Sequence, residues 1–149
     1  MKTILVAVDF SDASVAAVKQ ALELAAAFDS KVVALHVIHD PAEAPGFYSS
    51  KKAGKKVYRN MEEAAAKMMA AFVEEHCAKW KKLEVRVRPG IPGDEIVRQA
   101  GEEKADLVVI GTRGHSGLKR LLLGSVADRV IRACPCPVLS VHGDETGKP

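Results

Sequence analysis

The chain has 149 residues, of which 48% are hydrophobic, and this is the size of one ordinary domain with a continuous core. Its 22 basic and 19 acidic side chains give a formal net charge of +3, a balance that indicates neither a nucleic-acid nor a membrane partner. The lysine clusters at 51–56 and 79–82 are interpreted as solvated faces.

The cysteines and the N-terminal residues indicate the cellular setting. Three cysteines are too few, and odd in number, for a secreted disulfide framework, and they favour a reduced compartment. Met1 and Lys2 precede only six mostly apolar residues before Asp9, a run too short for a signal peptide or a membrane span. We therefore expect a soluble, cytoplasmic, single-domain protein over residues 1–149, with a frayed tail from about residue 143.

Five segments are predicted to be strands. Runs of β-prone residues indicate strands at 3–8, 32–38, 107–110 and 138–141. In the segment from Leu83 to Arg88 apolar and charged residues alternate, which predicts a strand with one polar face at an edge of the sheet.

Helical spacing predicts four helices between these strands. Ser11 or Asp12 is expected to cap the first helix, and Pro135 to end the fourth. Residues 40–58 contain two prolines and no sustained period, and they predict the one long loop. Val15, Val18, Leu22 and Ala25 recur at helical spacing in the first helix, and Val126, Val130 and Ile131 are placed on the fourth. In the second helix one face, expected to pack in the core, carries Met61, Ala65, Met68 and Phe72. In the third helix the residues expected to face inward are Ile96, Val97 and Ala100.

The alternation of strands and helices predicts the fold class. Each helix must cover one face of a sheet and return the chain to the same end, which requires parallel strands and right-handed crossovers. We therefore expect an α/β fold in which a five-stranded parallel sheet has helices on both faces.

A glycine-rich segment after the fourth predicted strand indicates a phosphate site. Glycine at positions 111 and 114 lets main-chain amides approach a ligand, and a helix that begins near Gly124 and Ser125 offers free N–H groups to an anion. The spacing matches neither a P-loop nor the dinucleotide fingerprint, which would follow the first strand.

The spacing of Gly111, Gly114, Gly124 and Ser125 resembles the nucleotide-binding signature of the universal stress protein family, in its ATP-binding branch. The resemblance extends to residues 4–9, 35–38, 90–92, 105–111 and 136–141. It implies a Rossmann-like, adenine nucleotide alpha hydrolase-like sheet with strand order 3-2-1-4-5, in which Asp9 and Gly111 flank the ligand crevice.

The same resemblance implies bound ATP, with Mg or Mn bridging the phosphates. Adenine or ribose is expected at Val8, Asp9 and Val37, and ribose and phosphates at the glycines and Ser125. The complete set of expected ligand-binding residues is Val8, Asp9, Val37, Ile110, Gly111, Arg113, Gly114, Gly124, Ser125 and Val126.

Two of these assignments have alternatives. Asp9 could serve as the cap of the first helix as well as a ribose ligand. Arg113, together with Lys119 and Arg120, could neutralise phosphates or simply lie in a solvated loop.

Several other polar residues are given structural interpretations. His115 has no recognisable partner for phosphoryl transfer, His36 is expected to be a satisfied core histidine, and no ligand role is assigned to His39. Cys134 and Cys136 are one residue too close together for a thioredoxin-like or zinc motif.

The predicted function is that of an ATP-binding, stress-linked regulatory module with little or no turnover and an unidentified protein partner. Family members typically form homodimers, and residues 138–141 are apolar enough to be an edge strand that pairs with a second copy. The alternatives are a slow ATPase or a phosphoryl or nucleotidyl transferase that uses the same pocket, and a nucleotide-free dimeric scaffold.

Overall fold

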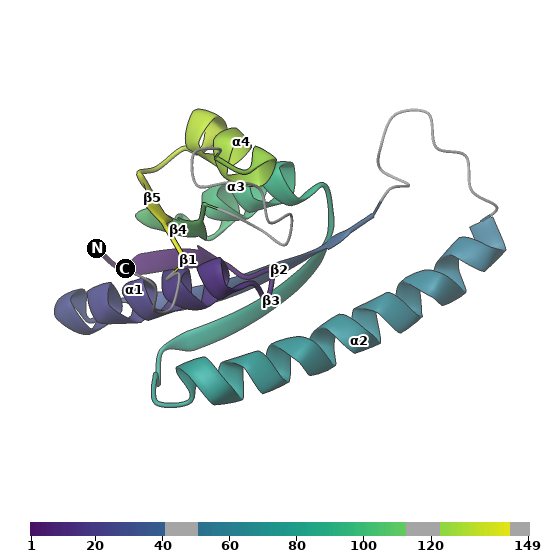
Figure 1. Ribbon diagram of the computed structural model, residues 1–149, viewed down its shortest axis with the longest axis horizontal. Coiled ribbons are helices and arrows are strands. Elements are labelled where there is room, and N and C mark those ends of the chain that lie inside the picture. The colour runs from purple at the N-terminus through teal and green to yellow at the C-terminus, as the bar shows by residue number, and fades with distance from the viewer. Residues whose placement is uncertain (41–50, 113–122, 144–149) are drawn as a thin grey trace, which may run out of the picture.

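The computed structural model of the protein describes residues 1–40, 51–112 and 123–143. Its five strands form one parallel sheet in the order β3-β2-β1-β4-β5, which confirms the predicted fold class and strand order (Figure 1). The elements are β1 (Thr3–Ala7), α1 (Asp12–Phe28), β2 (Lys31–His39), α2 (Lys51–Cys77), β3 (Leu83–Gly90), α3 (Pro92–Glu102), β4 (Leu107–Gly111), α4 (Ser125–Ala133) and β5 (Val138–Val141).

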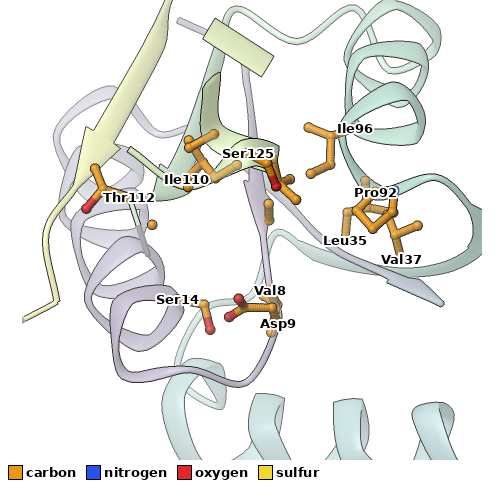
Figure 2. A pocket seen from close by; sticks show the side chains of 15 residues that line it. Val8, Asp9, Ser14, Leu35, Val37, Pro92, Ile96, Ile110, Thr112 and Ser125 are labelled. Carbon is orange, nitrogen blue, oxygen red and sulfur yellow. The ribbon is translucent and has the colours of Figure 1, made fainter. Parts of the chain in front are cut away.

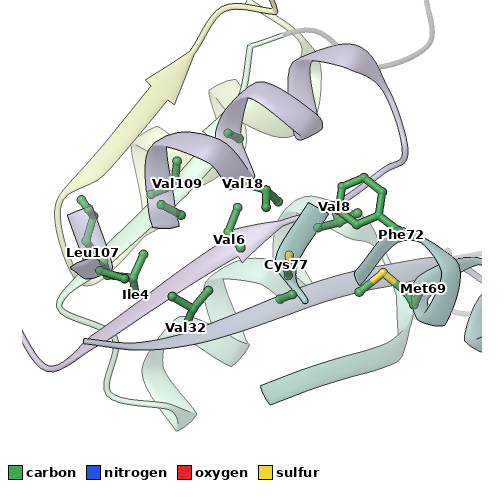
Figure 3. Packing of buried hydrophobic residues seen from close by; sticks show 14 residues of the cluster. Ile4, Val6, Val8, Val18, Val32, Met69, Phe72, Cys77, Leu107 and Val109 are labelled. Carbon is green, nitrogen blue, oxygen red and sulfur yellow. The ribbon is translucent and has the colours of Figure 1, made fainter. Parts of the chain in front are cut away.

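The helices cover both faces of the sheet, α1 and α2 on one face and α3 and α4 on the other (Figure 1). Alternate residues of β1 divide between the two cores, because successive side chains of a strand point to opposite faces. Ile4 and Val6 pack with α1 and α2 (Figure 3), whereas Leu5 and Ala7 pack with α3 and α4. This double burial explains the unbroken apolar runs of the central strands.

The helix ends follow the sequence signals. Ser11 caps α1 by accepting a hydrogen bond from the main-chain N–H of Ser14 at 3.2 Å. Pro92 occupies the first position of α3, where its missing N–H costs nothing, and two carboxylates follow in the first turn. Of the helices in the described ranges, none combines the length and the apolar composition that a membrane-spanning helix needs.

The second helix differs from its prediction in both extent and phase. α2 begins at Lys51, so residues 51–58 are helical and the predicted loop is too long; residues 41–50 lie outside the described part of the chain. Ala65 and Phe72 are buried as predicted, but Met61 and Met68 are 42% and 51% exposed, and the helix buries Met69 in place of Met68. Figure 1 shows that the N-terminal half of α2 extends past the sheet, so no apolar period marks its beginning.

The apolar residues of α4 differ in burial. Ile131 is 44% exposed, whereas Val130 is fully buried against the sheet. Val130 therefore lies on the face of α4 that packs on the sheet, whereas much of the Ile131 side chain is exposed to solvent. The tail beyond residue 143 lies outside the described ranges.

Candidate functional site

A cavity of about 400 Å³ opens at the carboxyl ends of β1, β2 and β4 (Figure 2). From β1 the chain adds β2 and β3 on one side of the sheet and then returns to add β4 and β5 on the other, so the strand order reverses between β1 and β4. Such switch points are where open α/β sheets bind ligands. The first residues of α3 and α4 complete the walls. The lining residues are Ala7, Val8, Asp9, Ser14, Leu35, Val37, Pro92, Ile96, Ile110, Gly111, Thr112, Gly124, Ser125, Val126 and Ala127.

The cavity gathers every predicted ligand-binding residue that the structure describes. These residues are Val8, Asp9, Val37, Ile110, Gly111, Gly124, Ser125 and Val126. Arg113 and Gly114, together with His115, Lys119 and Arg120, lie outside the described residues. Segments that are far apart in the sequence therefore converge on one place, as the crevice between β1 and β4 requires.

The cavity has an apolar side and a polar side. Figure 2 shows Leu35, Val37, Pro92 and Ile96 gathered on one side, whereas the side chains of Asp9 and Ser14 lie apart from them at the turn after β1. A flat heterocycle fits the apolar side, and hydroxyl or anionic groups fit the polar side.

The main chain of β2 faces the cavity beyond the point where β1 ends. β1 and β2 are paired only as far as Ala7 opposite Leu35, whereas β2 and β3 remain paired to His39 opposite Gly90. The carbonyl of Leu35 accepts a hydrogen bond from Val8 N–H at 2.8 Å, which shows that the odd-numbered residues of β2 turn their main-chain groups toward β1. The N–H and C=O of Val37 therefore point into the space left by β1.

The N-terminus of α4 forms a second wall. Gly124 is the N-cap residue and has no capping side chain, so the first N–H groups of the helix are not satisfied by a cap. Gly124 N–H donates to the carbonyl of Thr112 at 2.9 Å, which holds the start of the helix against the end of β4. Ser125, the first residue of α4, lines the cavity and adds a hydroxyl at this end of the helix (Figure 2). A hydroxyl and uncapped main-chain N–H groups are donors that suit an anion.

Asp9 organises the turn that closes the cavity. Its Oδ1 accepts a hydrogen bond from Ser11 N–H at 3.0 Å and another from the Ser11 hydroxyl, while Ser11 caps α1. Asp9 is therefore not the cap itself, which corrects the alternative assignment. The carboxylate lies at the cavity (Figure 2) while it supports the residue that begins α1.

Sequence reasoning missed several lining residues, most notably Ser14 and Thr112. Both are buried polar residues, and their hydroxyls already have partners, since Ser14 donates to the Ser11 carbonyl at 2.9 Å and Thr112 lies 3.0 Å from Nδ1 of His142. A serine in the first helical turn after β1 was the available signal for Ser14. Thr112 has no local signal, because its position depends on how β4, β5 and α4 meet.

The two neighbouring cysteines lie away from this cavity. The Sγ atoms of Cys134 and Cys136 are 3.7 Å apart and both cysteines are free. Burial and the contact with Cys134 raise the pKa of Cys136 to about 12, so this side chain is a thiol at neutral pH. Within residues 1–40, 51–112 and 123–143, no group of three His, Cys, Asp or Glu side chains is placed to hold a metal ion.

The chain matches known proteins along almost its whole length. The sequence model of the universal stress protein family matches residues 1–142. Universal stress protein MJ0531 of Methanocaldococcus jannaschii is 38% identical over 142 residues, which cover 94% of this chain and 81% of the relative. Universal stress protein Rv1636 of Mycobacterium tuberculosis is 35% identical over 95% of this chain and 96% of the relative.

Solved structures show the same architecture. The structure of Methanocaldococcus jannaschii MJ0577 is 30% identical, with a TM-score of 0.81 over 97% of this chain and 98% of that one. A universal stress protein in complex with cAMP is 34% identical, with a TM-score of 0.62 over 96% and 98% of the two chains. An Archaeoglobus fulgidus universal stress protein in complex with dAMP is 26% identical, with a TM-score of 0.61 over 95% and 98%. The chain belongs to the universal stress protein family.

Proposed function

We propose that this chain, acting as one domain, binds ATP in the cavity at the carboxyl ends of β1, β2 and β4 and serves as a nucleotide-dependent regulatory module in the stress response. The observation that carries the proposal is the placement of an apolar side, a main-chain edge and a helix N-terminus around one cavity. The complexes of two relatives with cAMP and dAMP support an adenine nucleotide as the ligand.

The base and the sugar would occupy the part of the cavity next to β2. The side chains of Leu35, Val37 and Ile96 offer apolar contact to a ring. The main-chain N–H and C=O of Val37 supply a donor and an acceptor for the edge of adenine, and the Asp9 carboxylate can accept from the ribose hydroxyls.

The phosphates would lie at the N-terminus of α4. The first main-chain N–H groups of this helix and the hydroxyl of Ser125 favour negative charge. Arg113 and Gly114 remain proposed phosphate ligands on the basis of the family resemblance. A Mg or Mn ion would rely mainly on phosphate oxygens, as such ions often do when they bind with a nucleotide.

We expect little or no turnover. The hydroxyl of Ser14, one of the polar groups at the cavity, already donates to the main-chain carbonyl of Ser11 and is not paired with a base. A slow ATPase or transferase would be recognised by phosphate or group release at about 1 per second or faster, which is the common range for enzymes.

The edge strand β5 is the proposed homodimer surface. Among the strands of the described residues β5 pairs only with β4, and its sequence Val-Leu-Ser-Val carries no charge that would oppose pairing with another strand. The opposite edge, β3, carries Glu84, Arg86 and Arg88 together with a proline, all of which discourage edge pairing. The three free cysteines fit the reduced cytoplasm as the proposed location of this dimer.

Calorimetric titration with ATP tests the binding site. Replacement of Ser125 by Asp puts a carboxylate where a phosphate would bind, while an acidic side chain in the first turn favours the helix itself. We expect the wild type to bind one ATP per chain and Ser125→Asp to bind at least about tenfold more weakly, without loss of thermal stability.

The matched control is Ala27→Asp, which adds the same charge at an exposed position in the last turn of α1, away from the cavity. This variant is expected to bind ATP like the wild type. Absence of any binding heat from the wild type at millimolar ATP would contradict the proposal and favour a nucleotide-free scaffold.

A further inference from the structure

His36 holds the main chain at the rim of the cavity from the opposite face of the sheet. Its Nδ1 lies 2.7 Å from the carbonyl oxygen of Val8. A carbonyl oxygen can only accept a hydrogen bond, so Nδ1 carries the proton and donates it. This contact joins the central part of β2 to the last residue before Asp9.

The contact interrupts the pairing of β1 and β2. In a parallel ladder, Val8 N–H donates to Leu35, as observed at 2.8 Å, and the Val8 carbonyl would then accept from Val37 N–H. The register of β1 and β2 stops instead at Ala7 opposite Leu35, and the Val8 carbonyl accepts from the imidazole of His36. The hydrogen bond from the His36 side chain thus takes the place of the main-chain bond from Val37 N–H to the Val8 carbonyl.

We propose that His36 is a positioning residue that keeps the N–H and C=O of Val37 available to a ligand. This inference rests on the proposed function and deepens it, because the Val37 edge is the part of the site that would read adenine. If the Val8 carbonyl were released, it would be free to pair with Val37 N–H, extend the ladder and close this part of the cavity.

The aromatic neighbours hold the imidazole in place. The ring centroid of Phe10 lies 4.5 Å from that of His36 and 5.8 Å from that of Phe72 on α2. Phe10 has a φ of 67°, a left-handed conformation that is unfavourable for a bulky side chain and persists only where the surrounding packing requires it. The turn that carries Asp9 is therefore built around the His36 ring, and α2 supports it from behind.

Amide hydrogen exchange of the nucleotide-free protein tests this role without reference to ATP. The variant His36→Leu keeps an apolar side chain in the core but removes the donor, whereas His36→Asn retains an N–H donor at a similar position. We expect the Val37 amide to exchange at least tenfold more slowly in His36→Leu than in the wild type, and at the wild-type rate in His36→Asn. An unchanged Val37 rate in a folded His36→Leu protein would overturn the proposal.

ATP affinity provides the second readout, with Ile4→Val as the control for general loosening of the same core, because Ile4 is fully buried in that core but lies near the start of β1, away from the cavity. His36→Leu is expected to weaken ATP binding at least tenfold, while His36→Asn and Ile4→Val stay within about threefold of the wild type. Equal losses in His36→Leu and Ile4→Val would assign His36 a merely structural role and overturn the inference. A wild type that binds no ATP would contradict the proposed function, whereas the exchange rate of Val37 would still decide whether His36 keeps this edge open.

Discussion

Gly111, the last residue of β4, lies directly against Ala13 in the first turn of α1. A Cβ atom at position 111 would come within 2.8 Å of both the carbonyl carbon and the Cβ of Ala13, a distance at which one of the two elements must move. The glycine therefore has a packing role in addition to exposing its main chain. It allows the start of α1, including Ser14, to reach the cavity.

Gly111→Ala is expected to destabilise the protein by about 1–3 kcal/mol, because the added methyl group overpacks the contact between β4 and α1. The matched control is Gly101→Ala in α3, where an added Cβ has no neighbour within 4 Å. That control should stabilise the protein by about 0.5–1 kcal/mol, since alanine favours a helix. Urea unfolding measures both changes, and wild-type stability in Gly111→Ala would contradict the packing argument.

The proposed dimer can be tested at a single main-chain group. The carbonyls of Pro137 and Val141 accept from Val108 N–H and from the N–H of Thr112, the residue after β4. The even-numbered residues of β5 therefore turn their N–H groups to the open edge. Ser140→Pro removes one outward N–H and leaves the pairing with β4 in place. Light scattering should show twice the 16.0 kDa chain mass for the wild type and the single mass for Ser140→Pro.

The corresponding change on the other edge is Val85→Pro, because the N–H of Val85 also points away from its neighbouring strand. This variant should remain dimeric. A wild type that is monomeric at micromolar concentration, or a Val85→Pro protein that dissociates as readily as Ser140→Pro, would rule out β5 as the interface.

The raised pKa of Cys136 predicts that the protein loses stability at alkaline pH. Its pKa is raised to about 12 in the folded protein by burial and by Cys134, whereas the thiol of an unfolded chain has its ordinary pKa of 9.0. Above that lower pKa the unfolded chain loses a proton that the folded chain retains, so the contribution is complete below pH about 9 and declines toward pH 12. The free energy of unfolding of Cys136→Ala should therefore fall less steeply between pH 8 and 11 than that of the wild type; identical slopes would contradict the assignment.

The sequence predicts the strands more completely than it predicts which face of the second helix is buried. Central strands such as β1 are apolar on both faces, so their composition reveals them without tertiary information. Met61, Met68 and Met69 all fit helical spacing, and only the position of the sheet decides which of them is buried. The first turns of α2 extend past the sheet and hence lack an apolar period altogether.

The same distinction applies to the cavity. Gly111, Gly124 and Ser125 belong to one local segment whose spacing is visible in the sequence. The hydrogen bond from His36 to Val8 joins residues 28 positions apart, and the contact of Thr112 with His142 joins residues 30 positions apart. No local sequence pattern predicts either contact. These contacts depend on strand register and on how the strand ends meet, which the sequence does not display.

The choice of buried residues in α2 gives a direct prediction about stability. Met69 is fully buried between α2 and the sheet, whereas Met68 is 51% exposed. Met69→Ala should cost about 2–5 kcal/mol of unfolding free energy through lost burial and a cavity, and Met68→Ala should change it by no more than about 0.5 kcal/mol. Chemical denaturation of the two variants compares them, and a larger effect at Met68 would contradict the observed phase.

The most direct test of the central claim is mass spectrometry of small molecules released when freshly purified protein is denatured. If the cavity binds adenine nucleotide, the wild type should release ATP or ADP, and the equally well folded Ser125→Asp variant should release much less. If the wild type releases no nucleotide and binds none at millimolar ATP, the account of this cavity as an ATP site is wrong.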